Sequence, residues 1–192
     1  MSPLEIVAAL FGVVCVALTI RRHMACWPTG LIQVVLYIVV FYRARLYSDM
    51  GLQVVFVVIQ IYGWYLWAKG KREEQEVRVV RLSKSEAWIW VIVAASASAG
   101  LGWSMKRWTD ASLPYWDATA TVLSLIAQFL MGRKILESWL IWIAVDVLSI
   151  GIYAAKDLYV TLALYVLFLA MATAGFFEWK KSWGTRLAAE RV

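Results

Sequence analysis

Three long apolar segments of this chain each carry a stripe of polar and aromatic side chains at helical spacing. Within a stripe the residues recur every three, four or seven positions, so they share one helix face at roughly 100° per residue. The stripes are Gln53, Gln60 and Trp64 in 47–68; Asp117, Thr121, Ser124 and Gln128 in 116–132; and Trp139, Trp142, Asp146, Ser149 and Tyr153 in 136–154. Because polar groups in hydrocarbon normally face a bundle interior or a wet cavity, the stripes predict one shared solute site.

The chemistry of these side chains suits a flat, positively charged solute that carries hydroxyl groups. Asp146 is the only acidic residue deep within a predicted span, and a lone buried carboxylate is protonated, paired or opposed by a cation. Trp64, Trp139 and Trp142 can stack on a flat ring or form cation–π contacts. For each Gln and Thr the alternative role is a hydrogen bond between helices, worth about 0.6–2 kcal/mol.

Enzymatic, metal-binding and nucleic-acid-binding functions are not indicated. His23, the only histidine, has no serine or cysteine at a spacing typical of a nucleophile, and Cys15 and Cys26 form no CxxC pair or metal set. The net charge of +6 comes from short Lys and Arg clusters between apolar runs, which membrane orientation explains better than nucleic acid. We therefore expect no catalytic site, no metal and no cofactor.

The elements that position the stripes are predicted to be membrane-spanning helices in contact with lipid. Of the 192 residues 62% are hydrophobic and 17% are charged, against about 45–50% and 25% in soluble domains. One span takes roughly 20 apolar residues, so seven spans leave only short connections. The predicted fold is an all-α integral membrane protein with helices at 3–20, 24–42, 47–68, 87–103, 116–132, 136–154 and 158–179.

The basic residues predict how these helices are oriented. Fourteen of the 19 Lys and Arg residues lie on one side, in the turns near 21 and 133, in the charged segment 69–86 and in the tail. The other side has Arg43, Arg45, Lys106, Arg107 and Lys156. By the positive-inside rule the N-terminus lies outside a bacterial inner membrane and the C-terminus lies in the cytoplasm.

The chain also contains an internal repeat at a constant offset of 112 residues. Matched pairs include Arg22–Lys134, Trp27–Trp139, Gly63–Gly175, Trp67–Trp179 and Lys69–Lys181. A fourth helix, rich in Ala, Ser and Gly, inverts the chain between the halves, so two triple-helix bundles share one orientation in a 3+1+3 order. We expect a first bundle in 1–68, a cytoplasmic linker and linker helix in 69–112, and a second bundle with a tail in 113–192.

Parallel repeats of this kind are found in SWEET-like transporters, which hold a solute near the midplane between two units that rock against each other. The polar groups of the stripes do not follow the repeat. Under the offset of 112 residues Gln60 pairs with Ala172, Gln128 with Val16, Ser124 with Gly12, and Asp146 with Val34. A symmetric frame with an unequal set of polar groups suits an asymmetric small molecule and predicts alternating access. The alternative is a duplicated structural membrane protein with no pathway.

Longer motifs resemble a known family over nearly the whole chain. The segments WPTGLIQVVLY (27–37), LYSDMGLQ (46–53), IYGWYLW (61–67), LPYWDATATVLSLIAQFLMGRKILESWLIWIAVDV (113–147) and DLYVTLALY (157–165) are similar to the PnuC nicotinamide riboside transporters. The resemblance implies a SWEET-like 3+1+3 fold, a homo-oligomer (a trimer) and facilitated diffusion of nicotinamide riboside. A cytoplasmic nicotinamide riboside kinase then traps the substrate by phosphorylation.

Carried over by position, the resemblance implies a set of binding residues in the second, third, fifth and sixth helices. They are Gln33, Gln53, Gln60, Trp64, Thr121, Gln128, Trp142 and Asp146, to which the stripes add Ser124 and Trp139. Relatives similar to PnuT carry thiamine, and others carry riboflavin or deoxynucleosides, so a thiamine carrier of the same fold is an alternative. Proton-coupled uptake through Asp146 is another.

Overall fold

The computed structural model describes residues 3–43, 47–72, 79–109 and 111–189, and that part of the chain contains seven α-helices. They are α1 (Pro3–Ile20), α2 (Cys26–Arg43), α3 (Tyr47–Arg72), α4 (Lys84–Trp108), α5 (Pro114–Gly132), α6 (Glu137–Ala155) and α7 (Tyr159–Ala189). The prediction of seven helices is confirmed. The helix α7 continues past its predicted end at residue 179, because Trp183 on the added turn still packs against the buried core.

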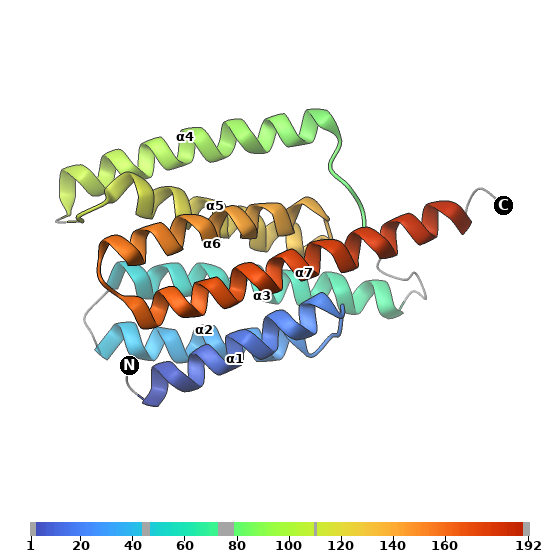
Figure 1. The fold of residues 1–192 in the computed structure, drawn as a ribbon, viewed down its shortest axis with the longest axis horizontal. Helices are drawn as coiled ribbons and strands as arrows, with labels where there is room; N and C mark the ends of the chain where they lie inside the picture. The colour runs from blue at the N-terminus through green and yellow to red at the C-terminus, as the bar shows by residue number, and fades with distance from the viewer. Residues whose placement is uncertain (1–2, 44–46, 73–78, 110, 190–192) are drawn as a thin grey trace.

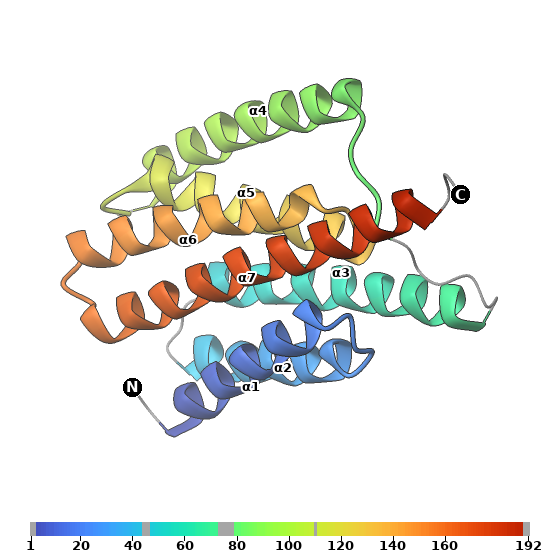
Figure 2. The ribbon, with the colours of Figure 1, turned by 45° about the vertical axis from the view of Figure 1, so that its right-hand side comes forward.

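Six of the helices form a closed ring. Along the ring α1 contacts α2, α2 contacts α3, α3 contacts α5, α5 contacts α6, α6 contacts α7, and α7 returns to α1. Within the described residues no two helix backbones approach each other across the ring, and the rings of Trp67 on α3 and Trp179 on α7 meet there. The inner faces of the six helices surround one central axis. The linker helix α4 lies outside the ring and packs only on α5, which Figures 1 and 2 show from two directions.

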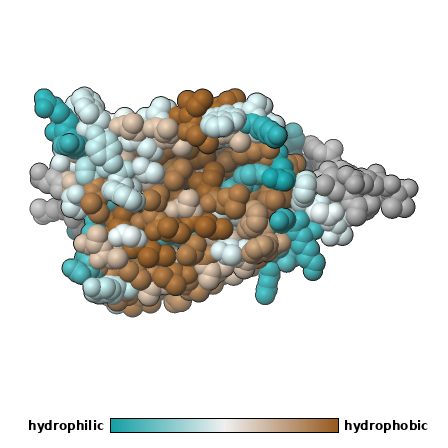
Figure 3. Space-filling view, turned by 45° about the horizontal axis from the view of Figure 1, so that its top comes forward, coloured by the Kyte–Doolittle hydropathy of each residue, from teal (hydrophilic) through white to brown (hydrophobic). Residues whose placement is uncertain are grey.

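On the face that Figure 3 shows, apolar residues cover the middle of the molecule and polar residues gather at both ends. Six of the seven described helices are long and apolar enough to cross a membrane, and α5 is the exception. The sequence of α5 includes polar residues such as Asp117 and Gln128. It contacts α3, α4 and α6, so three neighbouring helices shield it from lipid. A more polar span is therefore tolerated at this position.

The chain termini lie at opposite ends of the bundle, as an odd number of spans requires (Figure 1). The α1–α2 turn, the α5–α6 turn and the C-terminal part of α7 lie at one end, which we call the turn end. The two turns have the same geometry. Arg22 has φ 55° and Lys134 has φ 53°, and their amides donate to the carbonyls of Thr19 and Met131, both at 2.9 Å. Because these residues are related by the offset of 112, the repeat extends to the backbone conformation.

Side-chain packing repeats at the same end of the molecule. Trp27 of α2 lies flat against Gly63 of α3, where a Cβ would overlap the indole ring. Trp139 of α6 lies against Gly175 of α7 in the same way, and a Cβ there would be 2.6 Å from Cη2 of the ring. In each bundle a glycine on the third helix therefore makes room for a tryptophan from the second.

The connection between α3 and α4 differs in one respect from the predicted linker 69–86. The helix α3 extends to Arg72, and α4 begins at Lys84 because Ser83 caps it in a capping box with Glu86. The described part of the linker is therefore 79–83, an extended segment. Its Val80 forms a parallel bridge to Ile135, which ties the linker to the α5–α6 turn.

Candidate functional site

Three polar side chains of the predicted stripes are buried at the middle of their helices. Gln60 of α3 is 5% exposed, and Asp146 and Ser149 of α6 are 3% and 5% exposed. Asp146 is the tenth of the nineteen residues of α6, and Gln60 lies near the centre of the candidate span Asp49–Gly70. The two side chains come from different bundles and lie at about the same depth. This is the depth at which a midplane site between the bundles would lie.

The burial of Gln60 depends on a glycine of the neighbouring helix. A Cβ at Gly30 of α2 would overlap Oε1 of Gln60, so the amide occupies the space that a side chain at Gly30 would fill. At the equivalent positions of the second bundle the sizes are reversed, with Trp142 on α6 and Ala172 on α7. The repeat therefore accommodates an amide in one bundle and an indole in the other at matching places.

None of the predicted glutamine or threonine side chains forms the interhelical hydrogen bond that was their alternative role. Within the described parts of the chain, Gln33, Gln53, Gln60, Thr121 and Gln128 make no side-chain hydrogen bond, and Asp146 makes none either. In the described residues the fully enclosed side-chain polar atoms without a partner are Nε1 of Trp27, Oγ of Ser98 and Nε1 of Trp139, so the polar atoms of these six residues remain accessible. Their hydrogen-bonding capacity is free for a solute.

The hydroxyl of Ser124 is the exception among the predicted polar residues. Its Oγ donates to the carbonyl of Ala120, one turn earlier in α5, at 2.7 Å. Gln33 of α2 packs against Gly12 of α1, where a Cβ would lie 2.6 Å from Nε2. Gln33 therefore points along the α1–α2 interface. Ser124 keeps a local bond and offers mainly an acceptor oxygen to a ligand.

The three predicted tryptophans have different surroundings. Trp142 is partly buried and packs against the core cluster, so one part of its ring is covered and another is accessible. Trp64 is 39% exposed on the single chain, although the helical wheel places it beside Gln60. Trp139 is 2% exposed and packs edge-on to Trp179, with ring centroids 5.5 Å apart. Of the three, Trp142 fits a stacking role best.

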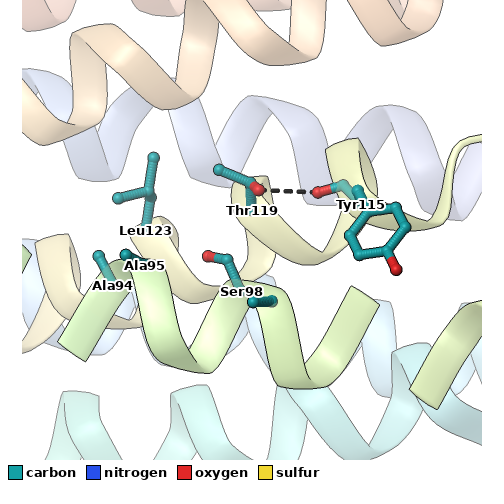
Figure 4. A pocket seen from close by; sticks show the side chains of 7 residues that line it. Ala94, Ala95, Ser98, Tyr115, Thr119 and Leu123 are labelled. Carbon is teal, nitrogen blue, oxygen red and sulfur yellow. Dashed lines mark hydrogen bonds between the residues drawn. The ribbon is translucent and has the colours of Figure 1, made fainter. Parts of the chain in front are cut away.

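One surface groove lies away from the predicted residues. It has a volume of about 340 Å³, lies between α4 and α5, and opens toward the outside of the ring (Figure 4). Its lining consists of Ala94, Ala95, Ser98, Ala99, Tyr115, Thr119 and Leu123. None of the ten predicted site residues contributes to it, so the groove is separate from the central axis.

The side chains buried at midspan have the types of chemical group that solute binding uses. The described residues contain no set of three His, Cys, Asp or Glu side chains able to hold a metal. An amide, a carboxyl group and a partly covered indole can recognise a hydroxylated aromatic cation through hydrogen bonds, charge and stacking. Sequence reasoning missed the role of Gly30, because a glycine that makes room for a side chain on another helix leaves no pattern along the chain.

Comparison with known families identifies the class of protein. Residues 2–181 match the family described as "Nicotinamide mononucleotide transporter", which is nearly the full length of the chain. The chain belongs to this family. It is therefore a multi-pass transporter of the bacterial inner membrane and not an enzyme.

Individual relatives agree with this assignment. The chain is 28% identical over 207 residues to the nicotinamide riboside transporter PnuC of Escherichia coli (strain K12), an alignment that covers 95% of this chain and 87% of the relative. It is 25% identical to the riboflavin/roseoflavin transporter RibM of Streptomyces davaonensis, over 91% of this chain and 83% of the relative. Its fold matches the crystal structure of the vitamin B3 transporter PnuC with a TM-score of 0.77 and 28% identity, covering 95% of this chain and 82% of that chain.

Proposed function

We propose that this protein carries nicotinamide riboside across the inner membrane by facilitated diffusion. The observation that supports the proposal most is the pair of unpartnered polar groups at midspan, Gln60 in one bundle and Asp146 in the other. Nicotinamide riboside combines a flat cationic ring with a hydroxylated sugar. Both features match the groups around the central axis.

Each group has a separate part in recognition. The Asp146 carboxylate faces the positive charge of the pyridinium ring, which would offset the cost of a lone carboxylate in the membrane. The Trp142 indole stacks on that ring. The amides of Gln60 and Gln128 and the hydroxyl of Thr121 bond the ribose hydroxyls or the carboxamide. Gln33, Gln53, Trp64, Ser124 and Trp139 complete the proposed set.

Transport follows from the relation between the two bundles. The proposed units are 1–68 and 113–192, joined by 69–112, and they rock about the central axis so that the site opens to each side in turn. Within the described residues the backbones of the two bundles approach each other in two helix pairs, α3 with α5 and α1 with α7, and Trp67 meets Trp179 at one end. So few contacts support such a motion. The substrate moves down its gradient, and a cytoplasmic nicotinamide riboside kinase traps it by phosphorylation.

The orientation and assembly are also proposals. Arg21, Arg22, Arg133, Lys180 and Lys181 lie on segments at the turn end, which supports a cytoplasmic turn end with the N-terminus outside. Resemblance to the family supports a homo-oligomer, proposed as a trimer. Large apolar side chains of α4 such as Trp88 and Trp103 are 68% and 56% exposed on the single chain, available to lipid or to another protomer.

Uptake into liposomes tests the mechanism. Purified protein in liposomes should let labelled nicotinamide riboside equilibrate with the lumen without accumulating above the outside concentration. Imposing a pH gradient of either sign should leave that end point unchanged. Accumulation driven by the gradient would support proton coupling through Asp146 instead, and no uptake at all would leave a structural membrane protein.

Titration of the purified protein tests the substrate. Nicotinamide riboside should bind, while thiamine and riboflavin at the same concentrations should neither bind nor compete. Binding of thiamine without any response to nicotinamide riboside would reject the proposed substrate while leaving the transporter assignment intact. Riboflavin binding would place this chain functionally beside its riboflavin-carrying relative.

A further inference from the structure

Two tryptophans meet at the turn end of the ring, where the bundles join. Trp67 of α3 is 1% exposed and Trp179 of α7 is 0% exposed, and their ring centroids lie 6.4 Å apart. The two residues are equivalent under the offset of 112 residues. Their contact therefore lies on the axis that relates the two bundles, between the proposed midspan site and the solvent at the turn end.

The indole N–H groups connect each bundle to the other. Nε1 of Trp67 donates to the carbonyl of Gly132, the last residue of α5, at 3.1 Å. Nε1 of Trp179 donates to the carbonyl of Ile20, the last residue of α1, also at 3.1 Å, and shares this N–H with the carbonyl of Thr19 at 3.3 Å. Ile20 and Gly132 are themselves equivalent in the repeat, so these bonds are two copies of one interaction. Each bond satisfies a helix-end carbonyl that has no partner within its own helix.

The basic residues of the two turns add a second connection between the bundles. Nζ of Lys134, in the α5–α6 turn, lies 4.0 Å from the centroid of the Trp67 ring on α3. Nη1 of Arg22, in the α1–α2 turn, donates to Oγ of Ser182 on α7. Both turn residues thus reach the third helix of the opposite bundle from the same left-handed backbone conformation.

We propose that Trp67 and Trp179 are the gating residues at the turn end, acting as a paired latch that must open before a solute can leave on that side. The role rests on the proposed transport function. When the bundles separate at this end, α3 leaves α5 and α7 leaves α1, so both indole bonds break in one step. The indole N–H groups of Trp27 and Trp139, which have no hydrogen-bond partner, remain within their own bundles.

A native cysteine reports on the latch without any substrate. Cys26 is 3% exposed and belongs to the core cluster that contains Trp67 and Trp179. In a Cys15→Ser background it is the only thiol of the chain. Its rate of reaction with a small neutral maleimide, measured on the purified full-length protein, then follows how often the cluster opens.

The test variants remove the indole N–H and keep an aromatic ring. Trp67→Phe and Trp179→Phe should each raise the labelling rate of Cys26 by about twofold to tenfold, the change in opening equilibrium expected for one lost buried hydrogen bond. Trp27→Phe is the matched control, because it loses the same ring atoms in the same cluster but no hydrogen bond. It should change the rate by less than twofold.

Equal labelling rates of Cys26 in all three variants and the parent would overturn the latch, and so would an increase in Trp27→Phe as large as in the other two.

If the variants do not fold, hydrogen exchange of the indole protons in the unmodified protein tests the latch instead. The indole N–H protons of Trp67 and Trp179 should exchange at one common rate, which is faster than the rate that global unfolding alone would give. Different rates for the two, or exchange only through global unfolding, would reject the proposal. Because neither measurement uses substrate, their failure is distinct from failure of nicotinamide riboside binding.

Discussion

The two triple-helix bundles of this protein agree at the turn end and differ at midspan. At the turn end both have a tryptophan lying on a glycine and a left-handed basic residue in the first turn. At midspan Gln60 in the first bundle faces Gly30, whereas the equivalent pair in the second bundle is Ala172 and Trp142. Asp146 likewise replaces Val34. The shared features hold the frame, and the unequal ones are those to which we assign recognition of an asymmetric solute.

The linker adds a second difference between the bundles. Residues 79–83 pair with the α5–α6 turn through Val80, and Nε of Arg81 lies 2.8 Å from Oε1 of Glu137 at the start of α6. The guanidinium of Arg81 also lies 5.3 Å from the centroid of the Trp183 ring on α7. All of these contacts are with the second bundle. The linker therefore joins α4 to the second bundle, and in the proposed mechanism this unit stays rigid while the first bundle moves.

The largest effect on stability is expected at the turn end, where the two bundles are predicted to be equivalent. Gly63→Val and Gly175→Val should each destabilise the protein by about 1–3 kcal/mol or prevent folding, because the new side chain overlaps Trp27 or Trp139. Gly151→Val on α6, where a Cβ meets nothing within 4 Å, is the control. Thermal unfolding in detergent measures the effect. A loss in only one of the two tryptophan–glycine variants would show that the bundles are not equivalent at this end.

An intermediate effect, on substrate binding, is expected at midspan, where the two bundles differ. Trp142→Ala should weaken nicotinamide riboside binding about tenfold or more, because it removes the ring proposed to stack on the pyridinium. Trp88→Ala on α4, whose side chain is 68% exposed on the single chain, should bind like the parent. Equal affinities of the two variants in a calorimetric titration would show that the site is misplaced.

The smallest effect concerns the linker. Glu137→Gln removes the ion pair with Arg81, whose side chain is 54% exposed, so the loss of stability should stay below about 1 kcal/mol. Binding of nicotinamide riboside should not change, while uptake should slow if the linker must keep the second bundle rigid. Uptake equal to that of the parent would remove the linker from the mechanism. Thermal unfolding and liposome uptake give both values.

The fold was largely predictable from the sequence because its signals are local or periodic. Apolar runs of about 20 residues define the spans, and the tryptophans and basic residues at one offset reveal the repeat. The site was less predictable. Periodicity places Gln60 and Trp64 on one face, but it does not say which side of that face is buried, and Trp64 is 39% exposed whereas Gln60 is 5% exposed.

Contacts between distant segments were not predictable at all. The bonds from Trp67 to Gly132 and from Trp179 to Ile20 join residues more than 60 positions apart. The pairing of Val80 with the α5–α6 turn is of the same kind. No spacing of residues along the chain predicts such contacts, because they depend on how the two bundles pack against each other.

The most direct test replaces one midspan polar residue in each bundle by the apolar residue at the equivalent position of the other bundle. The double variant Gln60→Ala and Asp146→Val places at each position the residue that its repeat partner already has, so a folded ring is expected. A calorimetric titration with nicotinamide riboside should then show affinity reduced at least about a hundredfold, since the polar and charged contacts are both lost. Affinity within threefold of the parent, in a variant that unfolds at a similar temperature, would contradict the account.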